Sequence, residues 1–122
     1  MLGLLVSSAV ACGGSVTSAP SATAPASGAV HTFVITSAGV SPKSMTVSPG
    51  TQITFVNQDG VAHLMFSDPH PEHTDCPEIN QVGSLASGQQ RETGNLNIVR
   101  TCGFHDHDMP SNASLHGTIT IR

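Results

Sequence analysis

The chain has 122 residues, a length that suits one folded domain. Charged residues make up only 10% of it, and the formal net charge is −4, with four Lys and Arg residues in all. A nucleic-acid-binding surface needs clustered positive charge, so this composition excludes nucleic acid as a partner.

The first segment, residues 1–11, is apolar or small. It is too short for a transmembrane helix, which needs about 20 apolar residues, and it predicts a signal peptide. The stretch "AVAC", ending at Cys12, resembles the lipobox of bacterial lipoproteins. That resemblance implies that Cys12 is lipidated and anchors an exported chain to the periplasmic or cell-surface face of a bacterial membrane. The alternative is an ordinary cleaved signal in which Cys12 has no special role.

The next segment, residues 12–29, continues from Cys12 with Ser, Ala, Thr, Gly and Pro and a single Val. Nothing in this segment could build a core, and small residues mixed with proline are typical of a flexible linker. Residues 30–122 form the predicted folded domain. Export would place that domain in a compartment where disulfides are permitted.

Within residues 30–122, apolar residues alternate with polar ones in several short runs separated by Gly, Pro, Asn and Asp. The alternating pairs are Phe33 and Ile35, Met45 and Val47, Ile53 and Phe55, Leu64 and Phe66, and Ile119 and Ile121. The stretch "LNIVRT", residues 96–101, is a further expected strand. This period-two pattern predicts an all-β fold, a small antiparallel β-sandwich. Residues 67–88 lack the alternation and are predicted to form a long functional loop.

The stretch "TCGFHDHDM", residues 101–109, concentrates side chains that can bind metals, and His63 begins a distant predicted strand. Cys102 and His105 are separated by two residues just before the last strand. This order resembles the cupredoxins, the Greek-key β-sandwich family of blue-copper proteins such as plastocyanin and azurin. The resemblance covers residues 30–122.

The resemblance implies a copper site. Its ligands would be the thiolate of Cys102 and the imidazoles of His63 and His105, with Met109 as a weak axial donor. Cys102 and His105 would both turn inward from one tight loop. Family spacing places the axial residue two positions before Gly117, at Leu115, so the axial position is either filled by Met109 or empty beside Leu115.

A second interpretation of the metal site starts from the cysteines. If Cys12 carries lipid, the two remaining thiols of an exported chain commonly pair, here as Cys76 with Cys102. Such a disulfide would remove the thiolate from the copper site. An all-imidazole metal site would then draw on the histidines at positions 63, 70, 73, 105 and 107, and it would also suit zinc or nickel. Both readings stay open on the sequence.

The expected function is copper binding in a membrane-tethered protein, for one-electron transfer or copper handling. The partner would be a redox protein, or a copper donor or acceptor, of unknown identity. The alternative is a metal-poor or all-histidine sandwich with a structural or metal-scavenging role. An enzyme is not expected, because nothing beside Cys102 and His105 supplies an oxyanion hole or an orienting acid.

Overall fold

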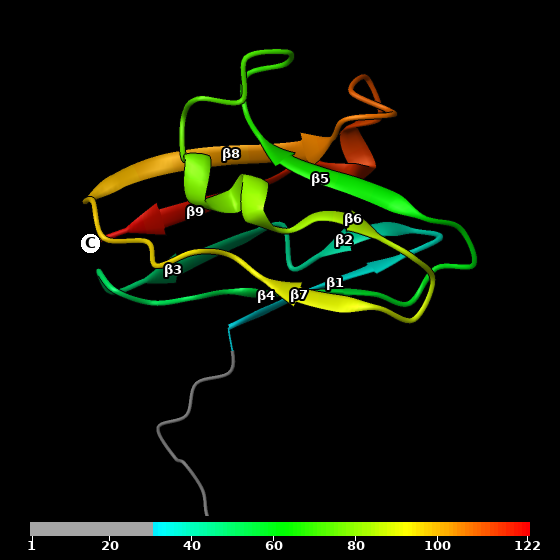
Figure 1. The fold of residues 1–122 in the computed structure, drawn as a ribbon, viewed down its shortest axis with the longest axis horizontal. Coiled ribbons are helices and arrows are strands. Elements are labelled where there is room, and N and C mark those ends of the chain that lie inside the picture. The colour runs from blue at the N-terminus through cyan, green and yellow to red at the C-terminus, as the bar shows by residue number, and fades with distance from the viewer. Residues whose placement is uncertain (1–30) are drawn as a thin grey trace, which may run out of the picture. The chain divides into compact units, whose positions relative to one another are not determined.

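The computed structural model describes residues 31–122. The predicted signal peptide (1–11), lipidated Cys12 and linker (12–29) lie outside the described residues. The described chain folds as two β-sheets packed face to face, with the core between them (Figure 1). No helix among residues 31–122 is long and apolar enough to cross a membrane.

The first sheet has four strands. Their order is β2 (Gly39–Ser41), β1 (Thr32–Thr36), β4 (Thr54–Asn57) and β7 (Gln90–Glu92). The pair β1 and β4 is parallel, whereas β1 with β2 and β4 with β7 are antiparallel. Phe33 and Ile35 on β1 are buried and their neighbours half-buried, so the alternation read from the sequence marks the face that packs on the core.

The second sheet has five strands and carries most of the residues discussed below. Their order is β3 (Ser44–Val47), β9 (Gly117–Ile121), β8 (Arg100–Asp106), β5 (His63–Ser67) and β6 (Gly83–Leu85). Only β3 with β9 is parallel among these pairs. In Figure 1, β5, β8 and β9 form the upper layer, and the loops that follow β5 and β8 rise beside each other above it.

The predicted β-sandwich is confirmed, and three details differ from the sequence reading. Two of its strand pairs are parallel rather than antiparallel. The expected loop over residues 67–88 also contains a short 3-10 helix, η1 (Pro77–Gln81), and strand β6. The strand expected from residue 96 begins at Arg100, and Leu96 makes only an isolated bridge to Thr51. Periodicity alone cannot report such pairings, because they depend on the route of the connections.

Three phenylalanine rings fill the centre of the sandwich. Phe33 and Phe55 come from the first sheet and Phe104 from the second, and their ring centroids are 4.8 to 5.2 Å apart. All three side chains are fully buried. Gly117 on β9 faces the ring of Phe104 so closely that a Cβ atom there would overlap it. The aromatic cluster therefore requires a residue without a side chain at position 117.

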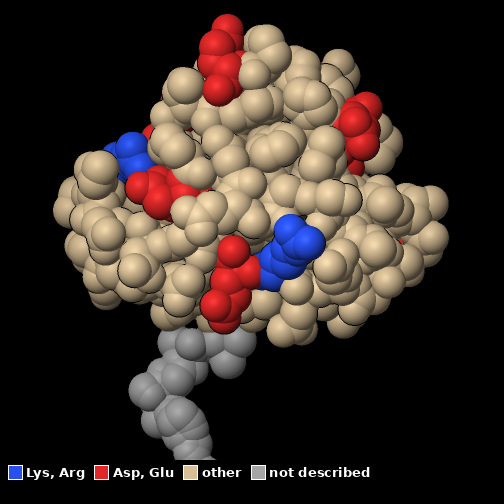
Figure 2. All heavy atoms as spheres, in the orientation of Figure 1, with Lys and Arg blue, Asp and Glu red and all other residues tan. Residues whose placement is uncertain are grey.

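The surface of the domain is sparsely charged. On the face drawn in Figure 2, basic groups lie against acidic ones on a mostly uncharged surface, and the charges form no continuous patch of one sign. One ion pair, between Arg100 and Glu78, joins β8 to η1 with an N–O distance of 2.7 Å. Surface pairs of this kind contribute little to stability, so burial of the apolar faces provides the main stabilisation.

Candidate metal centre

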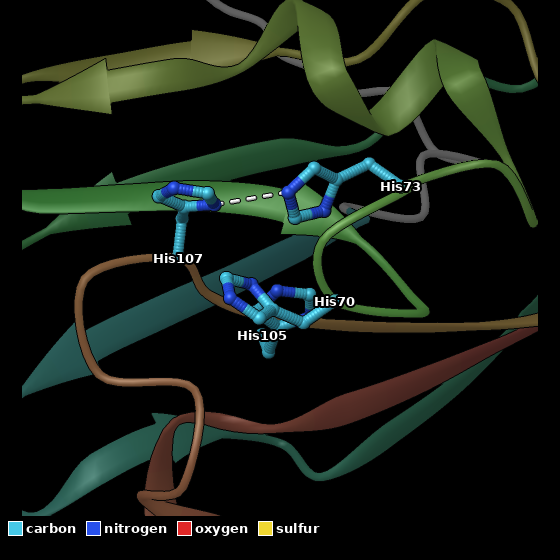
Figure 3. A group of neighbouring side chains, drawn as sticks. All are labelled: His70, His73, His105 and His107. Atoms are coloured by element: carbon cyan, nitrogen blue, oxygen red, sulfur yellow. Dashed lines mark hydrogen bonds between the residues drawn. The ribbon is translucent and has the colours of Figure 1, made fainter.

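Four histidines converge on the outer face of the five-stranded sheet. One ring nitrogen from each of His70, His73, His105 and His107 lies within 4.8 Å of the others. Figure 3 shows the rings of His73 and His107 facing each other, with those of His70 and His105 beside them. Two segments far apart in the sequence supply the four side chains, the loop after β5 and the end of β8 with the residue after it.

Strand pairing explains why these two segments meet. Phe66 on β5 is opposite His105 on β8, so the loop that follows β5 starts beside the end of β8. The ring of Phe66 points to the outer face, where it lies 4.8 Å from the ring of His73 and 5.5 Å from that of His107. The apolar ring of Phe66 therefore packs against two rings of the cluster.

Hydrogen bonds orient the ring of His73. Its Nδ1 lies 2.8 Å from the carbonyl oxygen of Ser67, which can only accept, so Nδ1 carries the proton. The Nε2 of neutral His73 then carries a lone pair, and this atom lies 2.9 Å from Nδ1 of His107. A metal ion taking the place of that hydrogen bond would find the His73 lone pair already directed at it.

His105 is oriented in the same way. Its Nδ1 donates to Oδ1 of Asp68 at 2.5 Å, and its side chain is 1% exposed. Its Nε2 is buried and has no hydrogen-bond partner within the described residues. A buried polar atom without a partner is costly. A metal ion in the cluster would satisfy it.

His70 is the exposed member of the cluster. Partial burial, and then the charges on His107, His105 and His73, lower the pKa of His70 below its ordinary value. The lowered pKa favours the neutral imidazole, which is the form that binds a metal.

The chemistry of these donors fits a divalent transition metal. Imidazole nitrogens bind zinc at about 2.0–2.1 Å in a tetrahedral arrangement, so the ligand nitrogens of such a site lie about 3.4 Å apart. The four ring nitrogens lie within 4.8 Å of one another, so they would have to approach one another to enclose an ion. A site of four imidazoles suits Cu(II), Zn(II) or Ni(II), and copper binds most tightly in the general affinity order.

Of the four residues that the sequence suggested as ligands, Cys102 is joined to Cys76 by a disulfide, with a Cα–Cα distance of 5.8 Å. Both cysteines are fully buried. The expectation that Cys102 and His105 both turn inward from one tight loop is wrong. Both residues lie within strand β8, where positions three apart point to opposite faces.

His63 lies on the inner face of β5 with Met65 and is nearly fully buried. Its Nδ1 is 2.6 Å from Oδ2 of Asp106, and its Nε2 is 2.9 Å from Oδ2 of Asp59. Burial disfavours the charged imidazolium, but the hydrogen bonds to Asp106 and Asp59 outweigh it and raise the pKa of His63. The hydrogen bond from His63, and then that from the Gly60 N–H, lower the pKa of Asp59. His63 is therefore part of an ion-paired group, apart from the four-histidine cluster.

Met109 and Leu115, the two candidates for the axial position, line one pocket with His63 and Asp59. This pocket has a volume of about 280 Å³. Met109 is 38% exposed, whereas Leu115 is 3% exposed. The structure thus brings His63 and Met109 to the same pocket and places Cys102 and His105 elsewhere.

Asp68 and Ser67, which orient the rings of His105 and His73, were not identified from the sequence. The available signal was their place directly at the end of a strand that leads into a histidine-rich loop. His70, His73 and His107 were identified only within the all-imidazole alternative, together with His63. Only the folded chain separates His63 from the other members of that set.

No protein-family model matches the sequence, and no curated protein matches it. Solved structures do match the fold. The oxidised form of plastocyanin from Dryopteris crassirhizoma aligns with a TM-score of 0.58 and 18% identity, over 75% of this chain and 99% of that one. A purple cupredoxin from Nitrosopumilus maritimus gives 0.58 and 18%, over 75% and 98%. A mutant of amicyanin in its Cu(I) form gives 0.59 and 12%, over 76% and 82%. The chain therefore has the cupredoxin fold.

Proposed function

We propose that this chain is an exported, membrane-tethered copper-binding protein that holds Cu(II) with the imidazoles of His70, His73, His105 and His107. The observation that carries the proposal is the convergence of four ring nitrogens, two of which have their lone pairs directed inward by hydrogen bonds on the opposite ring nitrogen. A fold shared with a solved Cu(I) protein supports copper as the metal.

The donor set favours copper handling over fast electron transfer. With Cys102 in a disulfide, the four-histidine cluster has nitrogen donors and no thiolate. A thiolate and a trigonal arrangement accommodate both Cu(II) and Cu(I), whereas imidazoles also bind zinc and nickel well. We therefore expect a protein that captures or passes on a divalent copper ion. Its partner would be a copper donor or acceptor.

Copper titration of the purified full-length chain, with its disulfide intact, tests the proposal. We expect one Cu(II) per chain, a weak visible absorption band, and an electron paramagnetic resonance spectrum with nitrogen hyperfine structure. His107→Ala should weaken binding at least tenfold. His31→Ala is the matched control, because His31 is a half-buried imidazole outside the cluster, and it should bind copper as the wild type does.

Two results would overturn this ligand assignment. One is equal copper affinity in His107→Ala and the wild type. The other is an intense visible charge-transfer band that Cys102→Ser abolishes, which would establish a thiolate site with His63, His105 and Met109 as the other ligands.

Export and tethering rest on the segment that ends at Cys12. We expect the chain to sediment with membranes and Cys12→Ala to be released to the soluble fraction with its fold intact. A Ser18→Ala change in the linker is the control. Continued sedimentation of the Cys12→Ala variant would refute the lipid anchor.

A further inference from the structure

Asp68 connects the four-histidine cluster to strand β8 through two contacts, one made by its backbone and one by its side chain. Its backbone N–H donates to the carbonyl oxygen of Gly103 at 2.9 Å, which fixes the start of the loop against β8. Its side chain accepts the Nδ1 proton of His105. The side chain of Asp68 is 33% exposed, whereas that of His105 is 1% exposed.

The position of the Asp68 carboxylate depends on residue 103 being glycine, which has no side chain. Gly103 lies on the same face of β8 as His105, and a Cβ atom on Gly103 would overlap Oδ2 of Asp68. The φ of Gly103 is not in the left-handed region. The backbone conformation therefore does not require glycine at position 103. Glycine is required because the Asp68 carboxylate occupies the space that a Cβ atom would take.

We propose that Asp68 is the positioning residue of the four-histidine site, acting through His105, and that Gly103 admits its carboxylate. The inference rests on the proposed function. Asp68 holds the proton of His105 on Nδ1. The buried Nε2 of His105 therefore carries a lone pair that is directed into the cluster. A carboxylate on the far nitrogen also makes an imidazole a stronger donor, and loss of such a partner typically lowers metal affinity by about 10–100-fold.

Binding of Zn(II) and of Cu(II) to the full-length chain is the first measurement. Asp68→Ala should weaken both about 10–100-fold. Asp68→Asn, whose amide oxygen still accepts the Nδ1 proton, should lose less. Asp75→Asn is the matched control, because Asp75 is an exposed acid in the same loop whose side chain has no hydrogen bond among the described residues. Equal losses of metal affinity in Asp75→Asn and Asp68→Ala would mean that only the negative charge of the loop matters, and this would overturn the inference.

The second measurement needs no metal. In the metal-free protein, nitrogen-15 NMR should show His105 protonated at Nδ1, and Asp68→Ala should mix the two tautomers. A purely structural role for Asp68 would leave the tautomer unchanged. His116, whose ring lies 5.9 Å from that of His105 and whose Nε2 is 2.8 Å from the carbonyl oxygen of Pro110, is the internal reference and should not change.

Gly103→Ala provides the third test. It should reproduce the loss of affinity seen in Asp68→Ala, and the double variant should lose no more than either single one, because both remove the same contact. Additive losses would separate the two residues and contradict the role given to Gly103. If the wild type bound neither Zn(II) nor Cu(II), the proposed function would fail, while the tautomer measurement would still decide whether Asp68 positions His105.

Discussion

His63 and His105 lie on opposite faces of the same sheet, although they come from the adjacent strands β5 and β8. His63 points inward and pairs with Asp106, the residue that follows His105. His105 points outward to the other three histidines. One step along β8 thus separates a buried ion pair from the four-histidine cluster, and the two can be tested by different substitutions.

The first prediction concerns the disulfide. Replacing Cys76 and Cys102 together by alanine should lower the free energy of unfolding by about 3 kcal/mol, because the bond closes a loop with a sequence separation of 26. Urea denaturation of the metal-free chain measures this. The variant should also bind copper more weakly, since the disulfide ties the loop carrying His70 and His73 to the strand carrying His105. Unchanged stability and unchanged copper affinity would together contradict this role.

The second prediction concerns pH. The folded-state pKa of His63 is raised above its ordinary value of about 6.5, so His63 stabilises the fold fully below that value. The contribution is lost as the pH rises through the raised pKa. His63→Gln should therefore destabilise the chain more at pH 5.5 than at pH 9.

Thermal unfolding of the metal-free chain at the two pH values measures this difference. His70 contributes with the opposite sign, because its pKa is lowered, but it is present in both proteins and cancels in the comparison. A stability difference between His63→Gln and the wild type that does not change with pH would show that His63 is not charged in the fold.

The third prediction concerns Met109. Its side chain lines the pocket beside His63, whereas the ligand atoms of the cluster are imidazole nitrogens from other positions. Met109→Leu should therefore leave copper affinity and the copper spectrum within about twofold of the wild type, whereas an axial thioether would tune both. Parallel copper titrations of Met109→Leu and His107→Ala make the comparison. A shifted spectrum in Met109→Leu would place the metal in the pocket.

The fourth prediction concerns the aromatic core. Phe104→Ala should lower the free energy of unfolding by about 3–5 kcal/mol, because it leaves a cavity between Phe33 and Phe55. Ile98→Ala is the control, since that side chain is 55% exposed and should cost little. Denaturant unfolding of both variants checks the difference. Similar losses in the two would mean that the three rings are not the centre of the core.

Much of the fold could be read from the order of residues along the chain. Alternation in "TFVIT" and "GTITI" identifies strands β1 and β9 with the correct faces, because successive side chains of any strand point to opposite sides. The same rule correctly put His63 on one face with Met65. The order of His63, Cys102 and His105 was enough to predict a cupredoxin-like sandwich, and the fold confirms it.

The four-histidine cluster depended on tertiary structure. A spacing of two residues between Cys102 and His105 allows a shared site if they lie in a loop, but it separates them onto opposite faces if they lie in a strand. Local sequence does not decide between these outcomes, because pairing of β8 with β5 and β9 extends the strand through both residues. That pairing also puts the loop after β5 beside His105, where Asp68 orients its ring, whereas the disulfide commits Cys102 to Cys76.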